Sequence, residues 1–237
     1  MQLSKLEYKA YQKLKESKLN IFKIGQLVLL LNIDKTSAYN LIKALKKKKA
    51  IVVLQNGTYS LNDIEDFAIG PYVNWPSYLS FWSALSYYKL TDQMPKKIFL
   101  ASTRYKRDNG VFKYVLISKK RFFGYQLIGD IIIADKEKAI IDSLLLPKYS
   151  GGIREIMNAV INSLGSLDLE KLTDYAIKMD SKAVVRRLGF ILEGCKIKKY
   201  KLKRLMRNIG KGYEKLDPTR PKMNKFNKTW LLDVNIP

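Results

Sequence analysis

Residues 33–51 read IDKTSAYNLIKALKKKKAI, and this stretch decides how the first part of the chain folds. Asp34 is a favourable N-cap, which predicts a helix that begins at Lys35. One side of this helix is apolar at helical spacing and must pack against neighbouring elements. The other side carries hydrogen-bonding groups near its start and cations toward its end: Lys35, Thr36, Ser37, Tyr39, Asn40, Lys43, Lys46 and Lys47.

Two further helices are predicted before this stretch. Residues 3–17, LSKLEYKAYQKLKES, carry apolar residues at helical spacing, and Ser4 with Glu7 fits a capping box. A second apolar helix is expected at about residues 23–31, and its end leads directly into Asp34. The stretch 33–51 is therefore the third helix of a small helical group.

A hairpin is predicted after the lysines. Residues 50–61, AIVVLQNGTYSL, contain two short strand-like runs joined by Asn56-Gly57, which is a strong hairpin signal. Three helices followed by a hairpin predict a winged helix-turn-helix domain over residues 1–62. Gln55 and Asn56 would then lie at the tip of the wing, near the backbone of a bound duplex.

The order of side chains along the third helix is typical of a helix that reads DNA. We expect Thr36, Ser37, Tyr39 and Asn40 to meet base edges. Asn40 is the best candidate for a bidentate contact to adenine. The four cations expected to meet phosphates are Lys35, Lys43, Lys46 and Lys47. The alternative is a solvated basic face that contacts protein, and Lys48 and Lys49 can also be read as a simple spacer between helix and strand.

The charge of the chain favours a polyanionic partner. It has 44 basic and 21 acidic residues, a formal net charge of +23. The excess lies at the two ends, with 12 lysines against 3 acidic residues in 1–62 and 13 basic against 3 acidic residues in 194–237. Such a surplus is typical of nucleic-acid binding. A Lys-rich composition of the source organism is the alternative explanation.

The scarcity of histidine and cysteine narrows the range of catalytic and metal sites that the chain can form. The chain has no histidine, which excludes His-based acid–base catalysis and His-containing zinc sites. It has one cysteine, Cys195, so no internal disulfide can form. No cofactor and no metal are expected. The sequence contains no apolar run of the ~18 residues that a membrane span needs and no secretion signal, so we expect a cytoplasmic protein without a membrane partner.

A second domain is predicted over residues 70–237, after a boundary near Gly70-Pro71. A helix is expected to open at Pro76, followed by four strand-like runs in an antiparallel meander and then by several helices. The C-terminal run 229–236, TWLLDVNI, is expected to return to that sheet. Segregated strands and helices indicate the α+β class: a winged helix-turn-helix, then an α+β domain with a small antiparallel sheet.

Four blocks of the second domain resemble the AbiEi family of type IV antitoxins. They are SALSYYKLTDQMPKKIFLAST at 83–103, IADKEKAIIDSLLLPKYSGGIREI at 133–156, RRLGFILE at 186–193 and LDPTRPKMNKFNKTWLLDVNIP at 216–237. No single block is a catalytic signature, and their joint order carries the resemblance. The blocks span most of residues 70–237, and a winged-helix start agrees with the architecture of that family.

The resemblance implies a DNA-binding repressor that acts as the antitoxin of an AbiE toxin-antitoxin system. In that family the winged helix binds inverted repeats in the promoter of its own operon. The second domain opposes a toxin from the neighbouring gene, AbiEii, which is a nucleotidyltransferase. The resemblance transfers no residue of the toxin-opposing function, because no short motif fixes it. A stand-alone winged-helix regulator without a toxin is the alternative.

Enzyme interpretations are weaker. A carboxylate-metal nuclease would use converging acids, and Asp130, Asp135, Glu137 and Asp142 cluster in sequence. The acid-x-Lys pattern of such nucleases is missing, and Asp135 is better explained as a helix N-cap. A nucleotidyltransferase would use a Gly-Ser pair followed by acids, as in Gly165-Ser166 with Asp168 and Glu170, but no strand precedes it. Asp168 is again expected to cap a helix, and no enzymatic activity is expected.

Overall fold

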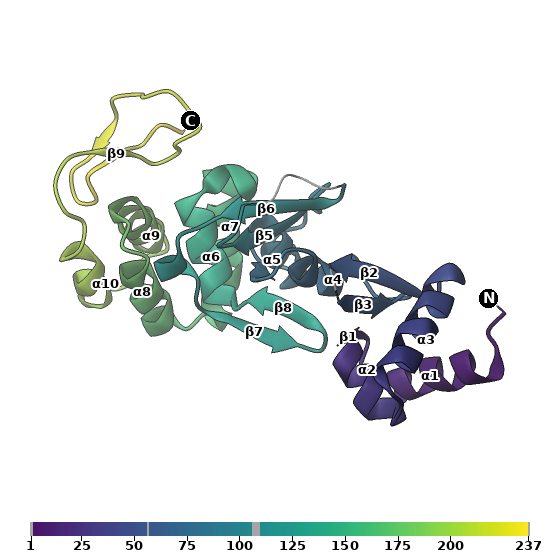
Figure 1. Cartoon of the computed structure of the whole chain (residues 1–237). Coiled ribbons are helices and arrows are strands. Elements are labelled where there is room, and N and C mark those ends of the chain that lie inside the picture. Colours follow the sequence, from purple (N-terminus) through teal and green to yellow (C-terminus); the bar gives the residue numbers. More distant parts are fainter. Residues whose placement is uncertain (1, 56, 106–109, 237) are drawn as a thin grey trace. The chain divides into compact units, whose positions relative to one another are not determined.

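The computed structural model describes residues 2–55, 57–105 and 110–236 (Figure 1). Contacts divide the chain into two compact units. The first contains the residues up to Ser77 together with Leu127–Ile132, and the second contains Tyr78–Gln126 and the residues from Ile133 onward. Both contain helices and strands, so the α+β class is as predicted.

The first unit is a group of helices followed by a three-stranded antiparallel sheet of strand order β1-β3-β2. Its buried core contains Leu14, Leu27, Leu45 and Leu61. The elements are α1 (Lys5–Glu16), β1 (Ile21–Lys23), α2 (Ile24–Leu31), α3 (Lys35–Lys47), β2 (Ile51–Gln55), β3 (Thr58–Leu61) and α4 (Asp66–Val73). The sequence did not indicate β1, which is three residues long.

Two predicted caps form in this unit. The Ser4 hydroxyl accepts a hydrogen bond from the Glu7 amide at 3.4 Å, and the Glu7 carboxylate accepts one from the Ser4 amide at 2.7 Å. Asp34 caps α3 by accepting a hydrogen bond from the Ser37 amide at 2.9 Å. Both α1 and α3 therefore begin where the local side chains satisfy the first free amides.

Gly70 and Pro71, where the domain boundary was expected, lie inside α4, and the first compact unit continues to Ser77. Proline removes one backbone donor, which disfavours a helix interior. Here Ala68, Gly70 and Pro71 are buried, and α4 packs against β2. Burial of this small-residue face outweighs one lost hydrogen bond.

The second unit contains most of a five-stranded sheet of order β6-β5-β4-β8-β7 and a group of helices. The sheet and its nearest helices are β4 (Ser77–Leu79), α5 (Phe81–Tyr87), β5 (Ile98–Ser102), β6 (Phe112–Leu116), η1 (Lys119–Arg121), β7 (Tyr125–Ile128) and β8 (Ile131–Ala134). The remaining helices are α6 (Lys136–Leu145), η2 (Pro147–Tyr149), α7 (Ile153–Ser163), η3 (Leu164–Ser166), α8 (Leu169–Lys178), α9 (Lys182–Gly194) and α10 (Lys199–Met206).

The predicted antiparallel meander is wrong for two strand pairs. β5 pairs with β6 in parallel, and β4 pairs with β8 in parallel. β4 occupies the stretch just after Pro76 where a helix was expected, and the helix α5 begins only at Phe81. Because β4 inserts between β5 and β8, strands that are consecutive in the sequence are not all neighbours in the sheet. Strand patterns do not specify such an insertion.

α6 is the central helix of the second unit. It packs against α5, α7, α8 and α9, and all of its residues from Glu137 to Leu144 are buried. A helix that is covered on all sides has no solvent-facing polar stripe. Polar groups on α6 must therefore find partners inside the protein, as Lys138 and Asp142 do.

The C-terminal strand does not return to the five-stranded sheet, contrary to expectation. β9 (Glu214–Lys215), β10 (Phe226–Asn227) and β11 (Leu232–Asp233) form a separate small sheet of order β10-β11-β9. Trp230 and Leu232 are fully buried beneath it. Among the described residues, no helix is long and apolar enough to cross a membrane.

Candidate nucleic-acid interface

α3 presents the predicted residues on one exposed face. Its opposite face is buried through Ala38, Leu41, Ile42 and Leu45. This arrangement leaves all eight predicted side chains of the outer face exposed: Lys35, Thr36, Ser37, Tyr39, Asn40, Lys43, Lys46 and Lys47. Tyr39 is large and still 50% exposed, so its ring is not part of the core.

A tight turn connects α2 to α3. Asn32 adopts the left-handed conformation, with φ 51° and ψ 53°, and its amide donates to the Val28 carbonyl. Asparagine tolerates this conformation better than most residues, and it ends α2 in the way that glycine ends many helices. The chain then needs only Ile33 and Asp34 to start α3. The two helices are therefore joined by a short connection rather than by a long loop.

The hairpin of β2 and β3 lies beside the outer face of α3. A shallow groove with a cavity volume of about 420 Å³ separates them. Its lining comes from α3 through Tyr39, Asn40, Ile42, Lys43 and Lys46, and from the hairpin through Val53, Gly57 and Tyr59. Sequence reasoning had not named Val53 or Tyr59. They are cross-strand partners in the hairpin, and the register shift between Val53 and Gln55 made this pairing unpredictable from the turn alone.

The run of four lysines divides into two parts. Lys46 and Lys47 end α3 on its exposed face, and neither they nor Lys35 and Lys43 have a carboxylate partner among the described residues. Lys48 instead donates to Glu7 on α1 at 2.6 Å. Its hydrogen bond is the main reason that the pKa of Glu7 lies below its ordinary value. Lys48 therefore ties α3 to α1, whereas the preceding lysines on α3 keep their charge exposed and unpaired among the described residues.

Not every predicted site residue is equally placed for base contacts. The Ser37 hydroxyl donates to the Asp34 carboxylate at 2.5 Å, and this bond lowers the pKa of Asp34. Ser37 can therefore only accept a further hydrogen bond. Gln55 ends β2 at the hairpin, but its side chain and the whole of Asn56 lie outside the described residues.

The acids considered for a metal nuclease each have a protein partner. Asp130 accepts from Asn20 at 2.5 Å, and Asp135 caps α6 and accepts from Tyr175. Glu137 accepts from the Asp168 amide at 3.0 Å. Asp142 is buried and paired with Lys138. Within 2–55, 57–105 and 110–236, no three His, Cys, Asp or Glu side chains lie close enough together to hold a metal ion.

The segment compared with a nucleotidyltransferase has an ordinary structural role. Gly165 and Ser166 lie in η3, between α7 and α8. Asp168 caps α8 by accepting from the amides of Glu170 and Lys171 at 3.0 and 3.1 Å. The prediction that Asp168 is a helix cap is confirmed, and no strand aims these groups at a common point.

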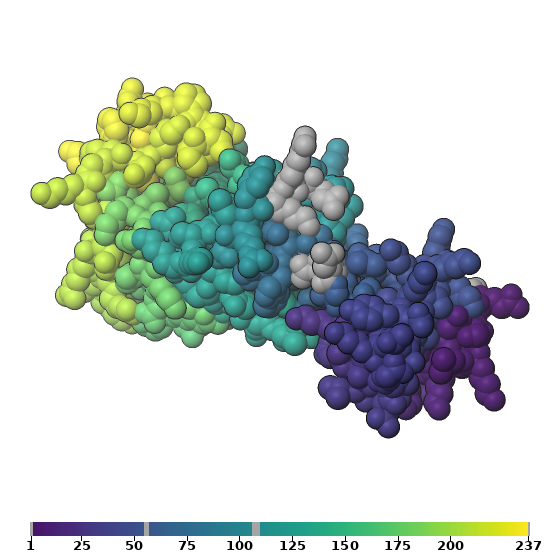
Figure 2. Space-filling model, in the orientation of Figure 1, coloured from purple at the N-terminus to yellow at the C-terminus, as the bar shows by residue number. Residues whose placement is uncertain are grey.

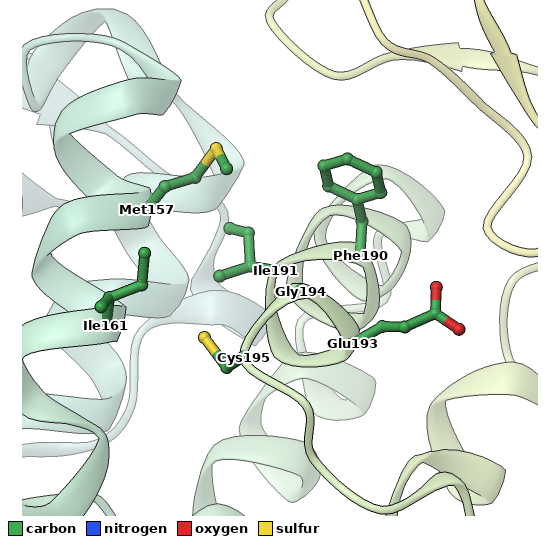
Figure 3. Close-up of a pocket in the computed structure, with 7 residues that line it drawn as sticks. All are labelled: Met157, Ile161, Phe190, Ile191, Glu193, Gly194 and Cys195. Carbon is green, nitrogen blue, oxygen red and sulfur yellow. The ribbon is translucent and has the colours of Figure 1, made fainter.

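An apolar cavity of about 350 Å³ lies between α7 and α9 in the second unit (Figure 3). Met157 and Ile161 face Ile191 and Cys195 across it, while the Glu193 carboxylate points away and accepts from the Trp230 indole at 2.9 Å. Burial raises the pKa of the Cys195 thiol, so the reactive thiolate is disfavoured. The cavity offers packing surface and no group that would perform chemistry.

Comparisons with known proteins give a fold and no function. No family model matches the chain, and no curated protein matches it significantly. The chain is similar in structure to the RV2827C protein from Mycobacterium tuberculosis, with a TM-score of 0.61 at 13% identity. The similarity covers 98% of this chain and 92% of that one. At this identity the similarity shows a shared fold alone.

Proposed function

We propose that the chain is a transcriptional regulator that binds double-stranded DNA through α3. Its first unit would be a winged helix-turn-helix, with α2 and α3 as the two helices and β2–β3 as the wing. The observation that carries this proposal is the exposed outer face of α3. It combines hydrogen-bonding side chains with four lysines that have no acidic partner among the described residues.

The geometry of a helix in the major groove explains the division of roles. A helix fits that groove, where each base pair presents a distinct pattern of donors and acceptors. Asn40 and Tyr39 lie in the middle turns of α3, beside the groove lined by the hairpin. Lys43 and Lys46 follow one and two turns later, where the phosphate backbone would pass. Lys35 opens the helix and would meet a phosphate, and Thr36 beside it would meet a base edge.

Repression would follow from occlusion. A protein that covers inverted repeats in a promoter excludes RNA polymerase without any enzymatic step. Binding of its own promoter would make the chain an autoregulator. The resemblance of the second unit to type IV antitoxins adds the proposal that it opposes a nucleotidyltransferase toxin encoded nearby. A stand-alone regulator without a toxin shares every DNA-binding prediction, so co-expression with the neighbouring gene separates the two.

Two substitutions test the assignment of α3. Asn40→Ala removes a base contact, and we expect it to relax preference at one base position at a cost of about 1–3 kcal/mol. Lys43→Ala removes a phosphate contact, and we expect it to weaken binding to all duplexes alike and to reduce the salt slope by about 1. Fluorescence anisotropy on a set of single-base operator variants measures both effects.

The two variants act as each other's control, since both side chains are exposed on the same helix. If Asn40→Ala leaves base preference intact while weakening all duplexes, then the reading face has been assigned wrongly. If neither substitution changes duplex affinity, α3 is not the interface.

A further inference from the structure

The C-terminal segment carries a second concentration of positive charge. Residues 196–228 contain 13 Lys or Arg and 2 acidic residues. Three of these cations have protein partners, namely Arg204, Lys215 and Arg220. The other ten are exposed and have no partner among the described residues: Lys196, Lys198, Lys199, Lys201, Lys203, Arg207, Lys211, Lys222, Lys225 and Lys228. Figure 2 shows the C-terminal part of the chain, in yellow, as a continuous piece of the surface.

Two aromatic rings lie among these cations. Tyr213 and Phe226 pack against each other, with ring centroids 4.8 Å apart and an interplanar angle of 60°. Tyr213 immediately precedes β9 and Phe226 opens β10, and β11 separates the two strands. The rings therefore meet over β11. They remain 47% and 53% exposed, so about half of each side chain faces solvent.

Packing alone does not account for this exposed pair. Trp230 and Leu232 are fully buried in the same small sheet. Asp233 of β11 is also buried and accepts from the amides of Met223 and Lys225 at 3.2 and 3.1 Å. The sheet thus has its own core and its own polar network. The outer faces of Tyr213 and Phe226 remain exposed to solvent.

We propose that this surface, which we call the C-terminal lobe and define as residues 196–228, binds single-stranded nucleic acid. Unpaired bases would stack on Tyr213 and Phe226, and phosphates would contact Lys211, Lys225 and Lys228, which are close to them in sequence. Exposed rings beside cations are the combination by which proteins bind single strands. A duplex buries the faces of its bases, so it would use the lysines and leave the rings unused. An acidic peptide would do the same.

The test uses the full chain with Lys43→Ala and Lys46→Ala, so that binding by α3 is weakened. The probes are labelled 12-nucleotide oligo(U) and oligo(dT), with a 12-base-pair duplex for comparison, measured by anisotropy at ~0.15 M salt. We expect both single strands to bind more tightly than the duplex. Tighter binding of oligo(U) than of oligo(dT) would identify RNA as the ligand. Equal binding of the two would mean that the C-terminal lobe accepts single-stranded RNA and DNA alike. Either result supports the proposal that the lobe binds single strands.

Two sets of variants locate the site. Tyr213→Leu with Phe226→Leu keeps apolar packing and removes the rings, and should lower single-strand affinity about 10-fold or more. Lys225→Ala with Lys228→Ala should weaken binding and reduce the salt slope by roughly 1 to 2. Lys96→Ala with Lys119→Ala removes the same charge from exposed lysines elsewhere in the second unit and should change little. Unchanged melting temperatures show that each variant is folded.

Three results would overturn the proposal. The first is equal affinity for single strand and duplex, and the second is an unchanged affinity when the rings are replaced in a folded variant. The third is a competition result, in which polyglutamate of the same charge displaces labelled oligo(U) at the same concentration as unlabelled oligo(U) does. That result would indicate a general site for acidic chains. None of these results tests the proposed DNA binding by α3, because that binding is measured separately, on duplex DNA and with α3 unsubstituted.

Discussion

The backbone of Gly189 on α9 lies directly against the ring of Trp230 in the second unit. A Cβ atom at position 189 would lie 2.0 Å from the Trp230 ring. Trp230 is fully buried, and its indole nitrogen donates to Glu193, one turn further along α9. Because glycine is the only residue without a Cβ, position 189 admits the indole ring directly onto the helix backbone. This contact anchors the small C-terminal sheet to α9.

We therefore expect Gly189→Ala to destabilise the second unit by about 3 kcal/mol, since the ring must move out of a packed core. Gly194→Ala is the matched control on the same helix, because its Cβ would meet nothing within 4 Å. That change should be neutral or stabilising by up to about 1 kcal/mol. Chemical denaturation measures both, and equal effects at the two positions would contradict the packing described.

Single side chains show how far sequence reasoning reaches. The caps at Ser4, Asp34, Asp135 and Asp168 were predicted because their cause is local, within three or four residues. The sequence set Lys48 and Lys49 apart as a possible spacer, but the partner of Lys48 was not predictable, because Glu7 is 41 residues earlier. The buried arginines were missed for the same reason.

Arg187 illustrates what such long-range partners do. Its guanidinium donates to the carbonyls of Leu144, Lys215 and Leu216 at 2.7, 3.1 and 3.0 Å. These contacts join three of the four blocks on which the antitoxin resemblance rests. Burial lowers the pKa of Arg187 to about 10, yet it stays charged at neutral pH. At Arg187 these blocks therefore stabilise the fold, and the proposed antitoxin role would have to use exposed residues outside such contacts.

The helix α6 depends on a buried ion pair. Lys138 and Asp142 lie one turn apart, and both side chains are inaccessible to solvent. Asp142 also accepts from the hydroxyls of Tyr78 and Ser80 at 3.0 and 2.8 Å. Desolvation lowers the pKa of Lys138, and the charge of Asp142 opposes that shift. The pair thus connects α6 to β4 and to the residue that precedes α5.

Asp142→Asn keeps an acceptor for the two hydroxyls and removes the charge that balances Lys138. We expect a loss of about 3–5 kcal/mol in the free energy of unfolding, because a buried cation is left uncompensated. Adding Lys138→Met to this variant removes the unpaired charge and should recover a large part of the loss. If the double variant is no more stable than the single one, the ion pair does not determine the stability of α6.

The stability of the Asp142→Asn variant should depend on pH in a defined direction. Without the Asp142 charge, the pKa of Lys138 falls further below its ordinary value of 10.5. The unfolded chain then binds more protons than the folded chain between the lowered pKa and 10.5, so stability rises with pH in that window. The difference in melting temperature between Asp142→Asn and the unsubstituted chain should narrow as pH increases from 7 toward 10. A constant difference would mean that Lys138 is not the group responsible.

Elements were predictable in proportion to their length. The long periodic helices and the β2–β3 hairpin appear near their predicted positions, since their patterns repeat over many residues. The strands β1 and β4 have three residues each, and β9, β10 and β11 have two, which is too short for a periodic signal. Because β4 was not predicted, the predicted order of strands in the sheet was also wrong. Pairing is decided by contacts that are distant in sequence.

The two units carry separate excesses of positive charge, one on α3 and one on the C-terminal lobe. The net charge of +23 is consistent with binding of duplex DNA and with binding of single strands. Charge alone attracts any polyanion, so it does not provide preference for one duplex sequence. Under the proposed function, specificity would come from the hydrogen-bonding side chains of α3. Whether the chain prefers one duplex is therefore the question on which the proposed function depends.

The decisive measurement is the anisotropy of the full chain on DNA from upstream of its own gene and on a scrambled duplex, across a salt series. We predict a preference for the upstream DNA that survives at ~0.15 M salt and is lost in Lys43→Ala with Lys46→Ala, while Lys96→Ala with Lys119→Ala retains it. Equal and steeply salt-dependent binding to both duplexes, or a preference that persists without the α3 lysines, would contradict α3 as a sequence-specific DNA interface.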